Sequence, residues 1–161
     1  MSRHVQAHQP LQLSSARKTE VRTQFAVLAF RVETGKNGPK TRVCLITSRT
    51  TKRWIMPKGW PMPGLSPAEA AAREAYEEAG VEGVILPDSL GLYSYRKRIA
   101  RASVPVIAVI YAMEVTKVHK TWPEARQRTR KWMSLKKASA RISDPELRQV
   151  IANFDPFTMR R

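Results

Sequence analysis

Four stretches of apolar and β-branched residues along the chain predict β-strands. Residues 21–32 and 41–48 are two of them, and the segment rich in glycine and lysine between them indicates a loop. Residues 104–115 form a long apolar run suited to a central strand, because their one proline stands next to the start. Residues 130–135 add a short strand. The pattern therefore predicts a β-sheet.

Two further segments have the composition or the spacing of α-helices. Residues 68–79 contain almost only good helix formers, and residues 145–154 place apolar side chains at helical spacing. The ends of the first helix carry an N-cap, a first-turn proline, a capping-box glutamate and a glycine for a left-handed C-cap: Ser66, Pro67, Glu69 and Gly80. Strands before, between and after two unequal helices predict an α+β protein, in which both helices flank a mixed sheet as an α/β/α sandwich.

Chain length and charge limit the number of domains and the kind of partner. Of the 161 residues 42% are hydrophobic, so we expect a single domain over residues 20–161. The formal charge of +16 arises from 29 basic and 13 acidic residues. Such a surface attracts anions, which indicates a polyphosphate, a nucleic acid or an acidic lipid headgroup as the partner.

The N-terminus, the apolar runs and the single cysteine bear on location. Residues 1–19 contain basic but no acidic side chains, which predicts a flexible N-terminal tail, with a mitochondrial transit peptide as the alternative. The apolar runs are too short for a membrane span of roughly 20 residues, so we expect no membrane partner. Cys44 has no second cysteine to pair with and lies in a predicted core strand, which favours the cytoplasm.

Carboxylates are concentrated in the predicted first helix of this otherwise basic chain. Glu69, Glu74, Glu77 and Glu78 fall within ten residues. Positions three and four apart lie on one helix face, so the last three carboxylates project together and repel one another. A divalent cation would convert this repulsion into oxygen coordination, which predicts a magnesium site. The alternative interpretation is a solvated helix face.

The surrounding segment, residues 59–81 (GWPMPGLSPAEAAAREAYEEAGV), resembles the Nudix box of the Nudix hydrolase superfamily. Leu65 departs from the box, which has a glutamate at this position. Glu69 lies four residues before Arg73 and is the candidate replacement partner for that arginine. The other eight of nine specified positions match in residue type and offset: Gly59, Arg73, Glu74, Ala75, Glu77, Glu78, Gly80 and Val81.

This resemblance implies a Nudix fold and the hydrolysis of a phosphoanhydride bond with a divalent cation. The implied metal ligands are three carboxylates and one backbone carbonyl, those of Glu74, Glu77, Glu78 and Gly59. Arg73 would orient the site, and Mg²⁺ is the expected cation, with Mn²⁺ as the alternative, since hard cations prefer carboxylate oxygens. Glu77 is the candidate general base, and Glu124 is the alternative base or an additional ligand.

Three more segments, residues 48–58, 93–101 and 122–132, resemble the diphosphoinositol polyphosphate and diadenosine polyphosphate phosphohydrolases. The resemblance implies phosphate contacts after the second strand, in the loop after the box helix, and before the last tryptophan. The implied substrate-binding residues are Ser48, Arg49, Arg53, Lys58, Arg96, Lys97, Arg98, Arg128 and Arg130. Arginine suits this role because it binds phosphate bidentately and stays charged. The alternative is a solvated basic surface. The four tryptophans could stack on a base or ring, but packing is the default role for most of them.

Three functional hypotheses follow. The first is metal-dependent hydrolysis of a diphosphoinositol polyphosphate or a diadenosine polyphosphate, a polyanionic small molecule. The second is pyrophosphate removal from a nucleotide or a triphosphorylated RNA end, which the same box would serve. The third is a noncatalytic nucleic-acid-binding module with a degenerate box, for which the charge and Leu65 are the only signals. The first is favoured, because the chain shows no nucleic-acid-binding motif.

Overall fold

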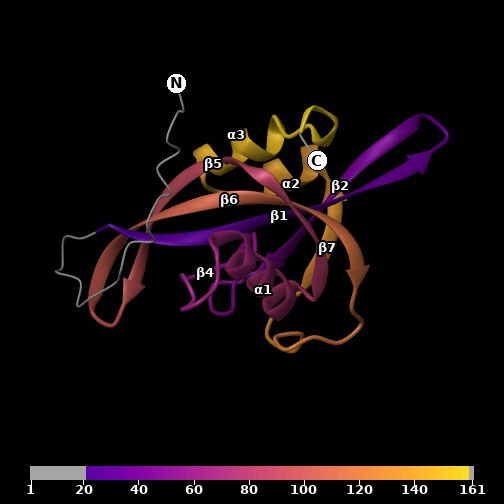
Figure 1. The fold of residues 1–161 in the computed structure, drawn as a ribbon. Coiled ribbons are helices and arrows are strands. Elements are labelled where there is room, and N and C mark those ends of the chain that lie inside the picture. Colours follow the sequence, from indigo (N-terminus) through magenta and orange to yellow (C-terminus); the bar gives the residue numbers. More distant parts are fainter. Residues whose placement is uncertain (1–20, 160–161) are drawn as a thin grey trace, which may run out of the picture.

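A seven-stranded mixed β-sheet runs through the part of the chain that the structure describes, residues 21–159 (Figure 1). The structure is a computed structural model, and the tail predicted for residues 1–19 lies outside the described residues. The elements in chain order are β1 (Arg22–Gly35), β2 (Gly38–Thr47), β3 (Trp54–Ile55), β4 (Lys58–Gly59), α1 (Pro67–Ala79), β5 (Val81–Ile99), β6 (Ala102–Val118), β7 (Arg130–Ser134), α2 (Leu135–Arg141), α3 (Pro145–Ala152) and a 3-10 turn (Pro156–Thr158).

The first strand, β1, occupies the centre of the sheet. The strand order is β3-β2-β1-β6-β5, while β4 pairs with β1 and β7 pairs with β2. Strands β1 and β6 are parallel, and the other pairs are antiparallel. Because Gly59 and Lys58 of β4 lie opposite Phe25 and Ala26 of β1, the segment that leads into α1 starts at the middle of the sheet.

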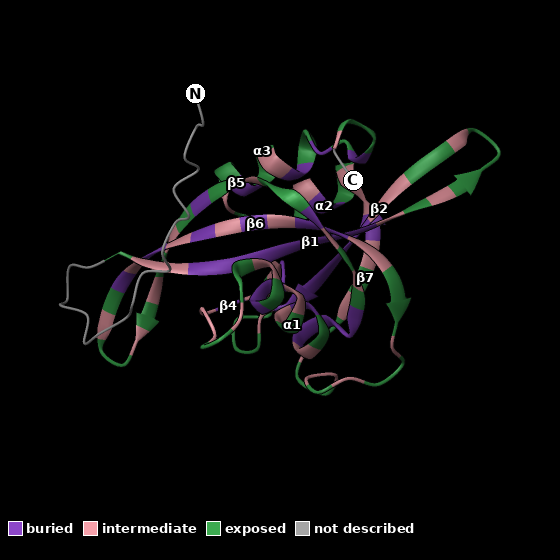
Figure 2. Ribbon diagram, viewed as in Figure 1, coloured by how far each residue is buried: buried purple, intermediate pink, exposed green. Residues whose placement is uncertain are grey.

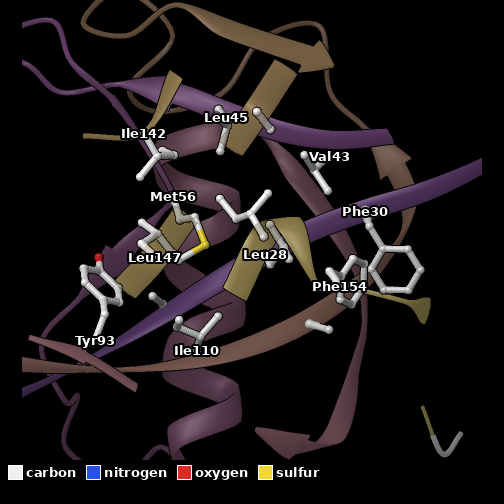
Figure 3. Close-up of a cluster of buried hydrophobic side chains, with 14 of the residues drawn as sticks. Leu28, Phe30, Val43, Leu45, Met56, Tyr93, Ile110, Ile142, Leu147 and Phe154 are labelled. Atoms are coloured by element: carbon white, nitrogen blue, oxygen red, sulfur yellow. The ribbon is translucent and has the colours of Figure 1, made fainter. Parts of the chain in front are cut away.

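Helices cover both faces of this sheet and create two hydrophobic cores (Figures 1 and 2). The alanine face of α1 packs against one side together with Val27, Cys44 and Met113. Helices α2 and α3 close the other side, where Phe30 and Phe154 meet edge to face with ring centroids 5.1 Å apart (Figure 3). The predicted α/β/α sandwich of α+β class is therefore confirmed, with three α-helices within residues 21–159 where the sequence predicted two.

Both ends of α1 have the predicted caps. The Ser66 hydroxyl accepts from the Glu69 amide at 3.2 Å, and the Glu69 carboxylate accepts from the Ser66 amide at 2.7 Å, which completes the capping box. Gly80 takes the left-handed conformation with φ 65° and ends the helix. These caps fix the residues at which α1 begins and ends.

The 19-residue strand β5 is the largest element that the sequence pattern does not predict. The resemblance to the phosphohydrolases implies a loop after the box helix, and this segment contains the turn formers Gly83, Pro87 and Gly91. The pairing with β6 instead shifts register three times between Glu82 and Gly91, and these bulges absorb the residues that would break a regular strand. The loop prediction was therefore wrong for three basic candidates, which lie on β5: Arg96, Lys97 and Arg98.

Two shorter predictions also need correction. Leu135 begins helix α2 and does not end a strand; with seven residues and only Ala138 buried, this helix is too short for a recognisable periodicity. The predicted loop after the first strand is a two-residue turn, because β1 and β2 remain paired as far as Gly35 and Gly38, and Gly38 has φ 91°. Among the described residues, no helix is long and apolar enough to cross a membrane.

Candidate active site

Strand β4 brings Gly59 against the middle of α1. A Cβ atom added to Gly59 would overlap the carboxylate of Glu74, so only glycine leaves room for that side chain. The close approach places the backbone of the segment before α1 beside a helix face that carries carboxylates. This explains why the box has glycine at its first position, independently of any backbone angle.

Glu78 is the most deeply buried of the candidate carboxylate ligands, with 8% of the residue exposed. One carboxylate oxygen accepts from the backbone amide of Lys58 at 3.1 Å, and the other lies 3.1 Å from the guanidinium of Arg128. Burial raises the pKa of Glu78, while Arg128 and the Lys58 amide act in the opposite direction. The carboxylate is therefore fixed in direction by two donors at the bottom of a cleft.

Glu74 lies among other carboxylates. Burial, together with the charges of Glu78, Glu77 and Glu124, raises the pKa of Glu74 to about 7. A site with excess negative charge and only oxygen donors fits a hard divalent cation in charge and chemistry. In the described part of the chain no three acidic, histidine or cysteine side chains already stand together as a metal cage, so these side chains would have to rotate to coordinate one ion.

Arg128 is the buried cation of this region, with a side chain that is 5% exposed. Its Nη2 atom lies 3.1 Å from Glu78 and 3.4 Å from Glu124, and its Nη1 atom donates to the carbonyl of Thr47 at 3.2 Å. Its Nε atom is buried without a hydrogen-bond partner. Arg49 approaches Glu124 from the outside at 3.7 Å. The predicted alternative base, Glu124, therefore belongs to the same cluster as Glu78.

Two connected cavities form a cleft beside Glu78. The smaller one, of about 210 Å³, brings one carboxylate and four predicted phosphate-binding cations together with hydroxyl side chains: Glu78, Arg49, Lys58, Lys97, Arg128, Ser48, Thr50 and Thr51. The larger one, of about 450 Å³, shares Ser48, Ile55 and Lys58 with it. Burial lowers the pKa of Lys58 to about 8, against the effect of Glu78. We call the smaller cavity the basic half of the cleft.

The larger cavity, which we call the aromatic half, has different walls. Tyr93 and Tyr95 of β5 stack with ring centroids 5.7 Å apart, and Trp54 of β3 lines the same cavity. Residues 142–144, between α2 and α3, and Pro145 and Leu147 of α3 line it too, as do Arg53 and Arg96. The cleft thus joins a region suited to phosphates to a region suited to a ring.

Four predicted site residues lie away from this cleft or are held by other groups. Arg98 is exposed on β5 and lines neither cavity. Arg96 donates to the hydroxyl and the carbonyl of Ser103 across the hairpin. Arg130 donates to carbonyls at the end of α1. Arg73 is exposed and lines a separate cavity between α1 and the strands β5 and β6.

The aromatic half is the part of the site that sequence reasoning missed. Tyr93, Tyr95 and Lys97 alternate along β5, so one side of the strand meets the cleft. This alternation is the signal in the sequence that indicates a strand here, and the expectation of a loop led us to overlook it. The lining residues from Ile142 to Leu147 follow directly after α2 in the chain, and α2 has no clear signal in the sequence.

Leu65 packs where the box has its first glutamate. It is half-buried against the core under α1, and Glu69 caps the helix and forms no ion pair with Arg73 among the described residues. We expect Leu65→Glu to lower stability by roughly 1–3 kcal/mol without raising activity, because a carboxylate replaces an apolar contact. Thermal melts of Leu65→Glu and of the control Leu65→Met test this. A Leu65→Glu variant as stable as the wild type and more active would show that Arg73 lacks a partner.

Comparison with known proteins agrees with this architecture. A NUDIX domain profile matches residues 22–154. "Nudix hydrolase 16, mitochondrial" of Arabidopsis thaliana is 32% identical over 120 residues, which cover 72% of this chain and 66% of that protein. "Diphosphoinositol polyphosphate phosphohydrolase 2" of Rattus norvegicus is 34% identical over 116 residues, which cover 70% and 58%. The chain thus spans about half to two thirds of the length of these curated relatives.

The solved structures agree on the fold. The Ap4A hydrolase of C. elegans superimposes with a TM-score of 0.60 at 20% identity, covering 86% of this chain and 98% of that one. At this identity the likeness concerns the fold alone. Because the domain profile covers most of the described sheet and all of α1, the chain belongs to the NUDIX domain family and has its fold.

Proposed function

We propose that this protein is a divalent-metal-dependent Nudix hydrolase that cleaves a phosphoanhydride bond in a highly phosphorylated small molecule. The observation that carries the proposal is the basic half of the cleft, where buried Glu78 shares one cavity with Arg49, Lys58, Lys97 and Arg128. A carboxylate that suits a cation and cations that suit phosphate meet there, which supports phosphoryl chemistry at this site. The names of related proteins, which are hydrolases, support the reaction class.

The residues have distinct proposed roles. Glu74, Glu77, Glu78 and the Gly59 carbonyl would hold Mg²⁺, or Mn²⁺ in its place. When bound, such a cation supplies charge neutralisation on the phosphate and a more acidic water. Glu77 is the proposed general base and Glu124, beside Arg128, is the alternative. Lys58, Arg49, Lys97 and Arg128 would orient phosphate oxygens.

The preferred substrates are diphosphoinositol polyphosphates and diadenosine polyphosphates. Three cations beyond Arg128 suit several phosphates in the basic half, and the stacked Tyr93 and Tyr95 would suit a base or a sugar ring in the aromatic half. A nucleotide or an RNA 5′ end is the alternative substrate. The cytoplasm remains our proposed location.

Phosphate release measured with and without Mg²⁺ tests this proposal on a diphosphoinositol polyphosphate, diadenosine tetraphosphate, ATP and a triphosphorylated RNA. Lys97→Ala and Arg98→Ala form a matched pair, because the two cations are neighbours on β5 but only Lys97 lines the basic half. We expect Lys97→Ala to lower kcat/KM about tenfold or more and Arg98→Ala to change it little. The dependence of kcat/KM on salt concentration should become shallower in Lys97→Ala and stay unchanged in Arg98→Ala. Absence of Mg²⁺-dependent cleavage of every substrate would refute the proposed activity.

The raised pKa of Glu74 makes the stability of the metal-free protein depend on pH. Its pKa is about 7 in the folded state against an ordinary value of 4.5, so the folded protein holds a proton that the unfolded chain has released between these values. Stability should therefore fall as pH rises from about 4.5 to 7, and Mn²⁺ affinity should rise over the same range. Urea unfolding in EDTA at several pH values measures the first effect. Glu74→Gln should flatten the slope, and an unchanged slope would contradict this assignment.

A further inference from the structure

Residues 119–130 hydrogen-bond the carbonyl groups at the end of α1. A helix leaves its last four carbonyls without partners inside the helix, and the amide of Gly80 accounts for only one of them, that of Tyr76, at 2.9 Å. The remaining three are paired as follows: Glu77 with the Glu124 amide at 3.1 Å, Glu78 with the Trp122 indole at 3.0 Å, and Ala79 with the Arg130 guanidinium at 2.8 Å. The amide of His119 adds a bond to the carbonyl of Gly80 at 2.8 Å.

The charge of Arg130 matters as much as its hydrogen bonds. The last turn of α1 has no basic residue of its own, although its carbonyls are the negative end of the helix and Glu77 and Glu78 add two carboxylates there. Arg130 supplies the missing positive charge from β7. Its guanidinium stacks 4.1 Å from the ring centroid of Trp122. That ring lies so close to the helix end that a Cβ atom on Gly80 would come within 2.7 Å of it.

We propose that Arg130 and Trp122 are positioning residues that hold the last turn of α1, and with it Glu77 and Glu78, in the orientation that binds the cation. Sequence reasoning placed Arg130 among the phosphate contacts. Its guanidinium is directed at two carbonyls and one indole ring, and Arg130 lines neither half of the cleft. Trp122, for which we propose the same role, donates a hydrogen bond from its indole to the backbone carbonyl of Glu78.

The same contacts connect the helix to the loop that carries Glu124 and Arg128. The Glu124 amide bonds the backbone of Glu77, and the Arg128 guanidinium lies between the carboxylates of Glu78 and Glu124. A rotation of the last helical turn would therefore move carboxylates on both elements. Groups that orient metal ligands commonly change metal affinity about tenfold to a hundredfold when they are removed.

The test compares Mn²⁺ affinity, measured by electron paramagnetic resonance of the free ion, in Arg130→Met, Trp122→Phe and Ser66→Ala. Arg130→Met keeps the side-chain length without the charge, and Trp122→Phe keeps a ring without the indole donor. Ser66→Ala is the matched control, because it removes a cap from the other end of the same helix. Melting temperatures of all three proteins show how far each variant destabilises the fold.

We expect Arg130→Met to weaken Mn²⁺ binding about tenfold or more and Trp122→Phe to weaken it in the same direction. Ser66→Ala should bind Mn²⁺ within about twofold of the wild type at a comparable loss in melting temperature. In steady-state kinetics kcat should fall in Arg130→Met while KM stays nearly constant.

Other results would overturn the inference. Equal Mn²⁺ affinity in Arg130→Met and Ser66→Ala would reduce Arg130 to general helix stabilisation, and a raised KM with unchanged Mn²⁺ affinity would make it a substrate contact. The inference rests on the proposed metal site, but the two fail separately. A wild-type protein that binds Mn²⁺ and cleaves no substrate refutes the activity alone, and one that binds no Mn²⁺ refutes both.

Discussion

Replacing Glu78 by Gln should lower turnover about a hundredfold or more while the protein still folds. The amide keeps the volume of the side chain and can still accept from the Lys58 backbone, but it removes the charge that would hold a cation at the bottom of the basic half. Glu77→Gln should lower turnover by a comparable factor, because it removes either a metal ligand or the general base. Initial rates at saturating Mg²⁺, together with Mn²⁺ affinity, measure both variants.

Glu33→Gln is the control for these two variants. Glu33 pairs with Arg31 and Arg42 on the strands β1 and β2, remote from α1 in the sheet register, so its charge should not affect catalysis. Turnover within a factor of three of the wild type for both Glu77→Gln and Glu78→Gln would refute the metal assignment. A loss of Mn²⁺ binding without a loss of turnover would show that the reaction does not require the bound metal.

Arg128→Met should cost about 3–5 kcal/mol of the free energy of unfolding in metal-free buffer. Its partners include the buried carboxylate of Glu78, and both side chains of that pair are at least nine-tenths buried. Removing the arginine leaves the Glu78 carboxyl in a poorly solvated place without its charge partner, with the Lys58 amide as its remaining hydrogen-bond donor. Urea unfolding in EDTA measures the loss, and the same experiment in Mg²⁺ should show a smaller one, because a bound cation would replace the missing charge.

A double-mutant cycle provides the control for Arg128. The double variant Arg128→Met with Glu78→Gln should be more stable than the sum of the two single losses predicts, since no charge is left buried without a partner. Additive losses would mean that the two side chains do not interact in solution. They would also remove the reason to regard Arg128 as the resident cation of this carboxylate cluster.

The ends of α1 were predictable because each signal was local. Ser66, Glu69 and Gly80 act within one helical turn, so the residue types alone imply the caps that the structure contains. The eight matching box positions placed Glu74, Glu77 and Glu78 correctly on this helix, whereas their distances to Arg128 depend on a loop that is remote in the sequence.

Arg130 illustrates what the sequence could not supply. In the chain it stands two residues after Arg128 with the same charge, and the resemblance implies the same phosphate-binding role for both. Arg128 lies in the loop before β7, where its guanidinium enters the carboxylate cluster, whereas Arg130 is the first residue of β7 and reaches the carbonyls of α1. The aromatic half was missed for a related reason, because the bulges of β5 are a property of its pairing with β6 and not of its composition.

The parallel pairing of β1 with β6 has a consequence for how the chain folds. Arg22 and Phe30 of β1 lie opposite Val106 and Glu114, so the strand at the middle of the sheet needs a neighbour from the second half of the chain. Contacts between residues so far apart are slow to form, because the intervening chain must first be ordered at a cost in entropy. During synthesis on the ribosome, the apolar segment of β1 emerges long before β6 and remains without that neighbour. The groups of residues 119–130 that pair the last carbonyls of α1 likewise become available only after the second half of the chain has been made.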